Sequence, residues 1–176
     1  MGAMALVPPI DATPDEVKAL LAPVRHDFSV AVIAAGNAFA VGAIVRVAHN
    51  FLAKEIVLVG SEPHYEKASM GMEKYETLVH VADESAFLSH VGTRPLWVLE
   101  KEAARRPLTG DFTFPPGVVL CFGSERFGVP RSIVERADEV LAIETFGVNN
   151  SLPVAIAAGI TMYEWTRRRY AGGAVR

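Results

Sequence analysis

Six short apolar runs recur along this chain and set the expectation for its fold. They lie at residues 28–34, 55–59, 78–81, 96–99, 118–122 and 140–143. Runs of this length suit buried strands and are too short for helices. Because strands that are buried on both faces read as near-continuous apolar runs, the pattern predicts a mostly parallel six-stranded sheet.

Amphipathic stretches between and after these runs predict helices at residues 38–51, 83–91, 131–136 and 152–169. In the first of them, Val41, Ile44 and Ala48 recur at helical spacing and are expected to face the core. A leading helix is predicted to begin at Thr13, where Pro14 follows directly and Glu16 completes a capping box. Strands interleaved with helices predict an α/β domain with helices on both faces of the sheet.

The chain is expected to form one domain with short appendages. Residues 1–27 read as a cloning remnant, Met1–Met4, followed by the leading helix. Residues 28–170 are expected to form the folded domain, and residues 171–176 a tail.

Composition narrows the class of protein. Of the 176 residues, 51% are hydrophobic and the mean hydropathy is +0.25, so something beyond the monomer's own core is expected to cover apolar surface. No run reaches the roughly 18 apolar residues of a membrane helix, and no basic region followed by an apolar one opens the chain. A cytoplasmic protein is therefore expected. A net charge of −3 argues against a broad polyanion-binding surface, so any nucleic-acid contact is expected to be local.

Cysteine and histidine usage gives no sign of metal or thiol chemistry. The single Cys121 lies inside an apolar run, where a packed thiol is the expected state. The five histidines are scattered without ligand spacing, so no metal site is expected.

Two glycine-bearing polar loops follow the last two apolar runs. They are residues 123–128, Gly-Ser-Glu-Arg-Phe-Gly, and residues 145–150, after which Asn150 or Ser151 is predicted to cap the final helix. Open α/β sheets bind ligands at the carboxyl ends of their strands, so the pair predicts a ligand cradle. For either loop taken alone, a bare structural turn remains an alternative, because such turns are common.

Asn37 and Arg46 are candidate functional residues of the first predicted helix. By default Asn37 is its N-cap, and Arg46 extends its aliphatic stem over apolar neighbours or forms a salt bridge. The functional alternative is that Arg46 grips a phosphate or sugar at the ligand edge.

Three motifs in order resemble the SpoU or TrmH-like branch of the SPOUT RNA methyltransferases, from about Phe28 to Tyr170. The first runs from Asn37 to Arg46 and the second is Phe122–Glu125 with Gly128. The third runs from Ile143 to Glu164, with Asn150-Ser151-Leu152 opening the helix. Any one of these would be a weak signal, but three in order are specific.

The resemblance implies a fold, a cofactor and an assembly. Family members thread the C-terminal segment through a loop to form a deep trefoil knot, an exception to the rule against threading. They bind S-adenosylmethionine there and work as homodimers through the knot region, each site being completed by the partner subunit. They methylate a ribose 2′-hydroxyl of tRNA or rRNA.

Carried over position by position, the resemblance assigns residues to roles. The implied catalytic residues, which activate and orient the acceptor hydroxyl, are Arg46, Asn37, Glu125 and Ser151. The implied cofactor contacts are Leu99, Glu100, Gly123, Ser124, Gly128, Ile143, Ser151 and Leu152. A solvated loop acid is the ordinary alternative for Glu125.

One position departs from the family. Pro153 stands where relatives commonly have asparagine after Ser-Leu. Proline costs little in the first helical turn, so the fold is expected to persist, but a side-chain amide near the ribose is absent.

Basic residues outside the motifs are candidates for local RNA contact: Arg25, Lys101, Arg105 and Arg106, together with Arg167–Arg169. For the last three, stabilisation of the helix C-terminus is an ordinary alternative. The sequence therefore predicts an S-adenosylmethionine-dependent RNA 2′-O-methyltransferase. A non-catalytic relative and an unknotted nucleotide-binding enzyme are the alternatives, although the second lacks a G-x-G-x-x-G fingerprint after its first strand.

Overall fold

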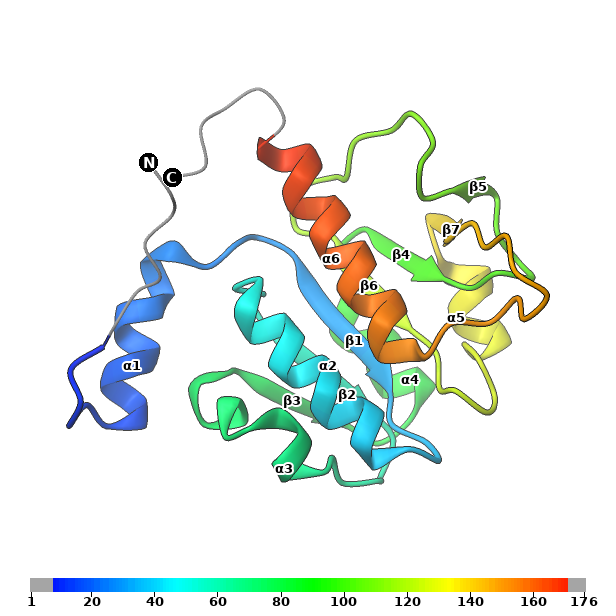
Figure 1. Ribbon diagram of the computed structural model, residues 1–176. Helices are drawn as coiled ribbons and strands as arrows, with labels where there is room; N and C mark the ends of the chain where they lie inside the picture. Colours follow the sequence, from blue (N-terminus) through cyan, green and yellow to red (C-terminus); the bar gives the residue numbers. More distant parts are fainter. Residues whose placement is uncertain (1–7, 171–176) are drawn as a thin grey trace.

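The computed structural model describes residues 8–170, which form a parallel sheet between two layers of helices (Figure 1). The strands are β1 (Ser29–Ile33), β2 (Ile56–Val59), β3 (Leu78–Val81), β4 (Leu96–Leu99), β5 (Arg106–Pro107), β6 (Val119–Phe122) and β7 (Glu139–Ala142). Their order is β3-β2-β1-β6-β4-β7-β5, and every neighbouring pair is parallel. The predicted α/β sheet is confirmed.

The predicted number of six strands was wrong, because the sheet has seven. The additional strand, β5, consists only of Arg106 and Pro107 at the edge beyond β7. A cation and a proline do not produce an apolar run, and proline suits an edge strand because it lacks an N–H to donate. Hydropathy therefore carried no signal for β5.

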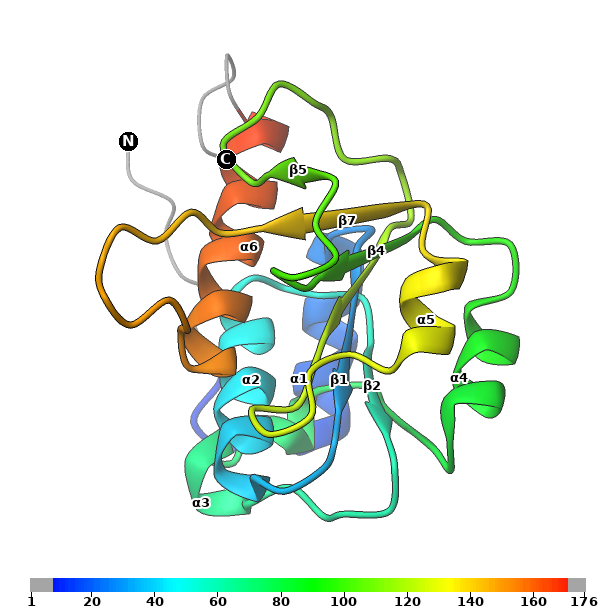
Figure 2. The ribbon, with the colours of Figure 1, turned by 90° about the vertical axis from the view of Figure 1, so that its right-hand side faces the viewer.

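The helices are α1 (Pro14–Leu21), α2 (Ala38–Asn50), α3 (Glu66–Ser69), α4 (Glu84–Val91), α5 (Arg131–Arg136) and α6 (Val154–Tyr170), with 3₁₀ turns η1 (Ala22–Val24) and η2 (Met72–Tyr75). Figure 2 shows α2 and α6 on one face of the sheet and α4 and α5 on the other. The prediction of helices on both faces is confirmed.

Alternating side chains of the strands build one core on each face. In β1, Val30 packs in a cluster with Ile44 of α2 and Met162 of α6, whereas its neighbour Ala31 belongs to a cluster with Phe87 of α4. All five are fully buried, and full burial of a Val, Ile, Met or Phe side chain stabilises the fold by about 1.5–3 kcal/mol. The first core fixes α2 and α6 against one face of the sheet, and the second fixes α4 and α5 against the other.

The N-terminal helix begins as predicted and is fastened to the domain. Thr13 and Glu16 form the capping box of α1, which contacts η2. The predicted cloning remnant and the tail at residues 171–176 lie outside the described residues. No helix within residues 8–170 is long and apolar enough to cross a membrane.

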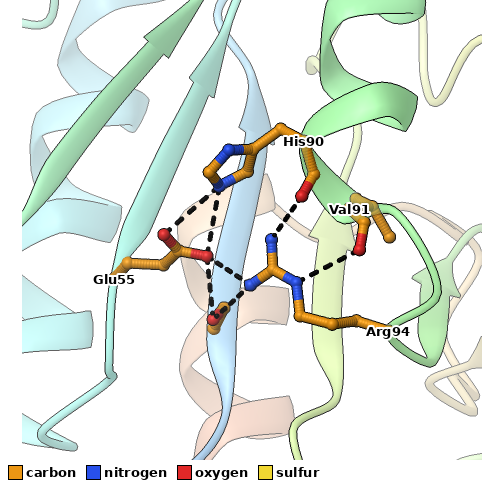
Figure 3. A network of polar contacts seen from close by, with 5 residues as sticks. Glu55, His90, Val91 and Arg94 are labelled. Atoms are coloured by element: carbon orange, nitrogen blue, oxygen red, sulfur yellow. Dashed lines mark hydrogen bonds and ion pairs between the residues drawn. The ribbon is translucent and has the colours of Figure 1, made fainter.

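A charged network joins the amino-terminal ends of β1, β2 and β4 (Figure 3). Arg94 donates to the Glu55 carboxylate and to the carbonyl of His90, and the His90 ring also contacts Glu55. Burial alone would raise the pKa of Glu55, but the hydrogen bonds and charge of Arg94, aided by His90, hold that pKa below its ordinary value. The network stabilises the edge of the sheet that lies opposite the predicted cradle.

The connection from β4 to β6, residues 100–118, is held against α6 by Arg168. Its guanidinium donates to the carbonyls of Leu108, Gly110 and Phe112 at 3.0, 2.8 and 2.7 Å and lies 3.9 Å from the centre of the Phe112 ring. Within the sheet, β7 lies between β4 and β5, so this connection passes around β7. The predicted threading of the C-terminal segment through a loop stays a prediction.

Candidate active site

The two glycine-bearing loops meet at the carboxyl edge of the sheet. Strands β6, β4 and β7 are neighbours and parallel, so their carboxyl ends open at one edge. A cleft of about 1010 Å³ lies there, lined by residues that follow all three strands. The predicted ligand cradle is thus a cavity shared by three strand ends.

The loop after β6 is closed on itself. The backbone N–H groups of Ser124 and Gly128 each donate to the other's carbonyl at 3.0 Å, and the Phe127 N–H donates to Oγ of Ser124 at 3.0 Å. Gly128 has φ +65°, a conformation that favours glycine. A Cβ on Gly123 would lie 2.4 Å from the Gly128 carbonyl carbon, so only glycine fits this close crossing.

Glu100 braces the same loop from the end of β4. Its Oε2 accepts a hydrogen bond from the Val129 N–H at 3.1 Å. The neighbouring Lys101 donates to the carbonyl of Asn150 at 3.1 Å, which joins β4 to the loop after β7. The β4 end therefore connects both walls of the cleft.

The loop after β7 is ordered by an asparagine that the sequence interpretation missed. Oδ1 of Asn149 accepts from both the backbone N–H and the hydroxyl of Ser151, at 3.1 and 2.9 Å. The prediction that Asn150 or Ser151 caps the final helix was wrong. The helix begins at Val154, and the Pro153 carbonyl accepts from the N–H groups of its first turn.

The structure brings every implied cofactor contact to this one cleft. Its lining includes Leu99, Glu100, Gly123, Ser124, Gly128, Ile143, Ser151 and Leu152. These residues come from three strand ends that are far apart in the sequence. Their roles as cofactor contacts stay predictions.

Asn37 joins the first motif to the second. Its Oδ1 accepts from the Ala40 N–H at 3.0 Å, so the predicted N-cap of α2 is confirmed. Its Nδ2 donates to the carboxylate of Glu125, which lines the cleft. One side chain thus caps α2 and fixes a carboxylate at the rim of the cleft.

Arg46 is not part of the cleft lining. It is exposed on the outer face of α2, in line with exposed Phe39 seven residues earlier. Within residues 8–170 its guanidinium forms no hydrogen bond or ion pair. The salt-bridged alternative is therefore not observed within the described residues, whereas the exposed guanidinium agrees with the snorkelling alternative. In a single chain Arg46 stands apart from the other implied catalytic residues, and its catalytic role stays a prediction.

Arg25, a candidate for RNA contact, is bound inside the protein, and contact with RNA stays a prediction. Its side chain is 11% exposed, and its guanidinium donates to the buried Glu76 carboxylate and to the carbonyls of Ala53 and Tyr75. These partners lie 28 to 51 residues away in the chain. Arg25 fastens the N-terminal segment to the domain.

The basic candidates Lys101, Arg105 and Arg106 are exposed and have partners inside the protein. Arg105 donates to the carbonyls of Ala137 and Asp138, and Arg106 pairs with Glu139 at 2.6 Å. Lys101 lies on the cleft. RNA contact by these three residues stays a prediction.

The cleft also contains residues that no motif assigned a role, namely Arg126, Phe127, Arg131, Thr145 and Asn149. Arg126 and Phe127 lie in the loop of residues 123–128, between Glu125 and Gly128 of the second motif, and this position was the only sequence signal for them.

The chain was compared with known families once this geometry was established. Residues 27–163 match the model of the SpoU rRNA methylase family. The chain belongs to the SpoU rRNA methylase family. The resemblance carried by the three motifs is confirmed, and membership excludes the alternative of an unrelated nucleotide-binding enzyme.

Individual SpoU-family relatives agree with this membership. The chain is 31% identical over 136 residues to the putative TrmH family tRNA/rRNA methyltransferase YacO of Bacillus subtilis, covering 73% of this chain and 53% of that protein. It is 31% identical over 117 residues to a tRNA (guanosine(18)-2′-O)-methyltransferase of Thermus thermophilus, covering 65% and 59%. The chain spans about half the length of the curated relatives it matches.

Solved SpoU-family structures share the fold. The methyltransferase AviRb from Streptomyces viridochromogenes in complex with AdoMet superposes with a TM-score of 0.75 at 25% identity, over 86% of this chain and 64% of that one. An AdoMet-bound rRNA methyltransferase from Sinorhizobium meliloti gives 0.71 at 26% identity, over 85% and 60%.

Proposed function

We propose that this protein is an S-adenosylmethionine-dependent RNA methyltransferase that methylates a ribose 2′-hydroxyl of tRNA or rRNA. The observation that carries the proposal is the cleft in which the second and third motifs meet and to which Asn37 joins the first. Relatives named as guanosine 2′-O-methyltransferases of tRNA and 23S rRNA support the reaction.

The residues of the cleft fit S-adenosylmethionine. Apolar Leu99, Ile143 and Leu152 offer a surface for a purine ring, and backbone groups of both loops offer donors and acceptors for its polar edges. The close crossing at Gly123 excludes any side chain there and keeps the loop in its closed form. When bound, the cofactor supplies an activated methyl group on a sulfonium.

The protein's own task is to position and polarise a hydroxyl, because a ribose hydroxyl is a poor nucleophile at neutral pH. Asn37 fixes the Glu125 carboxylate at the rim, where it can orient the ribose by hydrogen bonding. Arg46 holds the adjacent phosphate and stabilises the alkoxide charge as it develops.

A second copy of the chain brings Arg46 to the cleft. Helix α6 carries an exposed apolar stripe, Ile156, Ile160 and Tyr163, at helical spacing. It lies beside α2 (Figure 1). The outer face of α2 bears exposed Phe39 and Arg46. When two copies bury this face against each other, each Arg46 reaches the cleft of the partner subunit. This arrangement explains why Arg46 lies outside the cleft of its own chain and why the composition is so apolar.

Although Pro153 stands where relatives commonly have asparagine, the cleft still contains other side-chain amides. Asn149 and Asn150 both line it. These neighbours support catalysis in place of the asparagine that relatives commonly have after Ser-Leu. The remaining alternative is a non-catalytic relative that binds RNA or the cofactor.

Two measurements test the proposed function. Isothermal titration calorimetry is expected to show binding of S-adenosylmethionine and none of NAD. Incubation with labelled cofactor is expected to transfer methyl groups into RNA from cells that lack the protein. Cofactor binding without transfer into either tRNA or rRNA would favour the non-catalytic relative, and the absence of cofactor binding would reject the proposal.

A further inference from the structure

Phe127 is an exposed aromatic residue on the rim of the cleft. It exposes 69% of its surface, although it lies in the middle of the loop that the second motif forms. Cores and structural turns do not require such a residue, and exposing an aromatic ring to water is unfavourable. The position of Phe127 therefore suggests a partner that arrives at the cleft.

The loop holds this ring in a fixed position. The paired hydrogen bonds between Ser124 and Gly128 close the loop, and the Phe127 N–H is itself bound to Oγ of Ser124. The Glu100 carboxylate adds a hydrogen bond to Val129 directly after the loop. Because the backbone is already ordered, a ligand that stacks on the ring loses little affinity to ordering of the loop.

A cation accompanies the ring. The guanidinium of Arg126 lies 5.2 Å from the centre of the Phe127 ring, and both residues line the cleft. An aromatic face combined with an arginine is the combination that proteins use for unpaired nucleobases, since the ring stacks on the base and the cation pairs with the phosphate backbone. A purely apolar protein surface would leave Arg126 buried without a partner.

We propose that Phe127, with Arg126 beside it, is a stacking platform for the unpaired nucleobase of the acceptor nucleotide. The inference rests on the proposed function and adds a specificity-determining residue to it. Glu125, which orients the ribose, is two residues away in the same loop, so one rigid loop holds both the base and the sugar of a single nucleotide. Stacking accepts any base, so the platform selects unpaired nucleotides over paired ones.

Phe127→Ala and Phe127→Trp test this platform. For Phe127→Ala, kcat/KM for bulk RNA from cells lacking the protein is expected to fall on the order of ten-fold, through KM, with unchanged affinity for S-adenosylmethionine. Phe127→Trp is expected to retain activity. Leu20→Ala, which removes a 43% exposed apolar side chain of α1 outside the cleft lining, serves as the control and is expected to keep wild-type kinetics.

A fluorescence readout separates this inference from the proposed function. Trp97 and Trp165 are buried, at 8% and 4% exposure, so the tryptophan in Phe127→Trp is the one that bulk RNA can quench, with or without methyl transfer. Quenching by RNA supports the platform even if the wild type transfers no methyl group. The absence of transfer would reject only the proposed function. Absent quenching, a wild-type KM in Phe127→Ala, or dissociation of its dimer in light scattering would overturn the platform.

Discussion

Gly123 is the residue on which the shape of the cleft depends most directly. A Cβ at this position would meet the protein's own Gly128 and Val129 backbone, at 2.4 to 2.7 Å. Backbone atoms at such distances must move, so even a methyl group deforms the closed loop.

Gly123→Ala is therefore expected to lower the affinity for S-adenosylmethionine at least ten-fold in calorimetry. Gly147→Ala is the matched control, since its Cβ would come no closer than 3.8 Å to another atom and its loop is expected to tolerate it. An unchanged affinity in Gly123→Ala would show that the closed loop does not hold the cofactor.

Single residues also show where sequence interpretation succeeds and fails. Asn37 was predicted as an N-cap because its partner, Ala40, lies three residues away. The ion pair of Arg25 was not predicted, because its partner, Glu76, lies 51 residues away and leaves no local trace. Local chemistry can thus be read from the chain, whereas a cation's solvent exposure depends on packing.

At the scale of elements, Glu164 and Arg168 fasten α6 to the connection around β7. The pKa of Glu164 lies below its ordinary value of 4.5, chiefly because Arg167 donates a hydrogen bond to its carboxylate. Burial acts in the opposite direction, and a hydrogen bond from Arg168 adds to the lowering. A carboxylate with a lowered folded-state pKa stabilises the fold above its unfolded-state pKa, and that stabilisation is lost as the pH falls through the folded-state value.

Glu164→Gln is accordingly expected to reduce the free energy of unfolding at about pH 7 and to make little difference at about pH 3. Urea denaturation followed by circular dichroism at both pH values measures this. Glu135→Gln, which removes an exposed pair with Arg131, is the control and should change little at either pH. An equal effect of Glu164→Gln at both pH values would mean that its charge does not stabilise α6.

The helices and strands that the sequence predicted correctly are those with a local signal in the chain. Six strands were predicted from their apolar runs, and α2 from its spacing and its cap. The start of α6 was placed too early. The Ser151 N–H and hydroxyl both donate to Oδ1 of Asn149, so Ser151 belongs to a turn before the helix and not to its first turn. Short α3 and two-residue β5 carry too few residues for any periodicity.

At the scale of the whole molecule, the account requires two copies of the chain. In the proposed active site the cleft belongs to one subunit and Arg46 to the other. A heterodimer of Arg46→Ala with Gly123→Ala therefore has one site with both defects and one with none, and is expected to retain about half of wild-type methyl transfer. Arg46→Ala alone should bind S-adenosylmethionine normally and transfer no methyl groups.

Coexpression of the two variants with different affinity tags, followed by tandem purification, isolates this heterodimer. Light scattering of both homodimers confirms that each variant still assembles. An inactive heterodimer would place Arg46 in the cleft of its own subunit, and a monomer mass for the wild type would remove the shared site.

The central claim, that the methyl group goes to a ribose 2′-hydroxyl, is tested most directly by alkaline hydrolysis of the methylated RNA. RNA from cells lacking the protein is incubated with the enzyme and S-adenosylmethionine labelled in its methyl group, then hydrolysed to completion. A free 2′-hydroxyl is needed to cleave the adjacent phosphodiester, so a 2′-O-methyl group leaves its label in alkali-stable dinucleotides. The account predicts label in those dinucleotides, and label in mononucleotides, which marks methylation of a base, would contradict it.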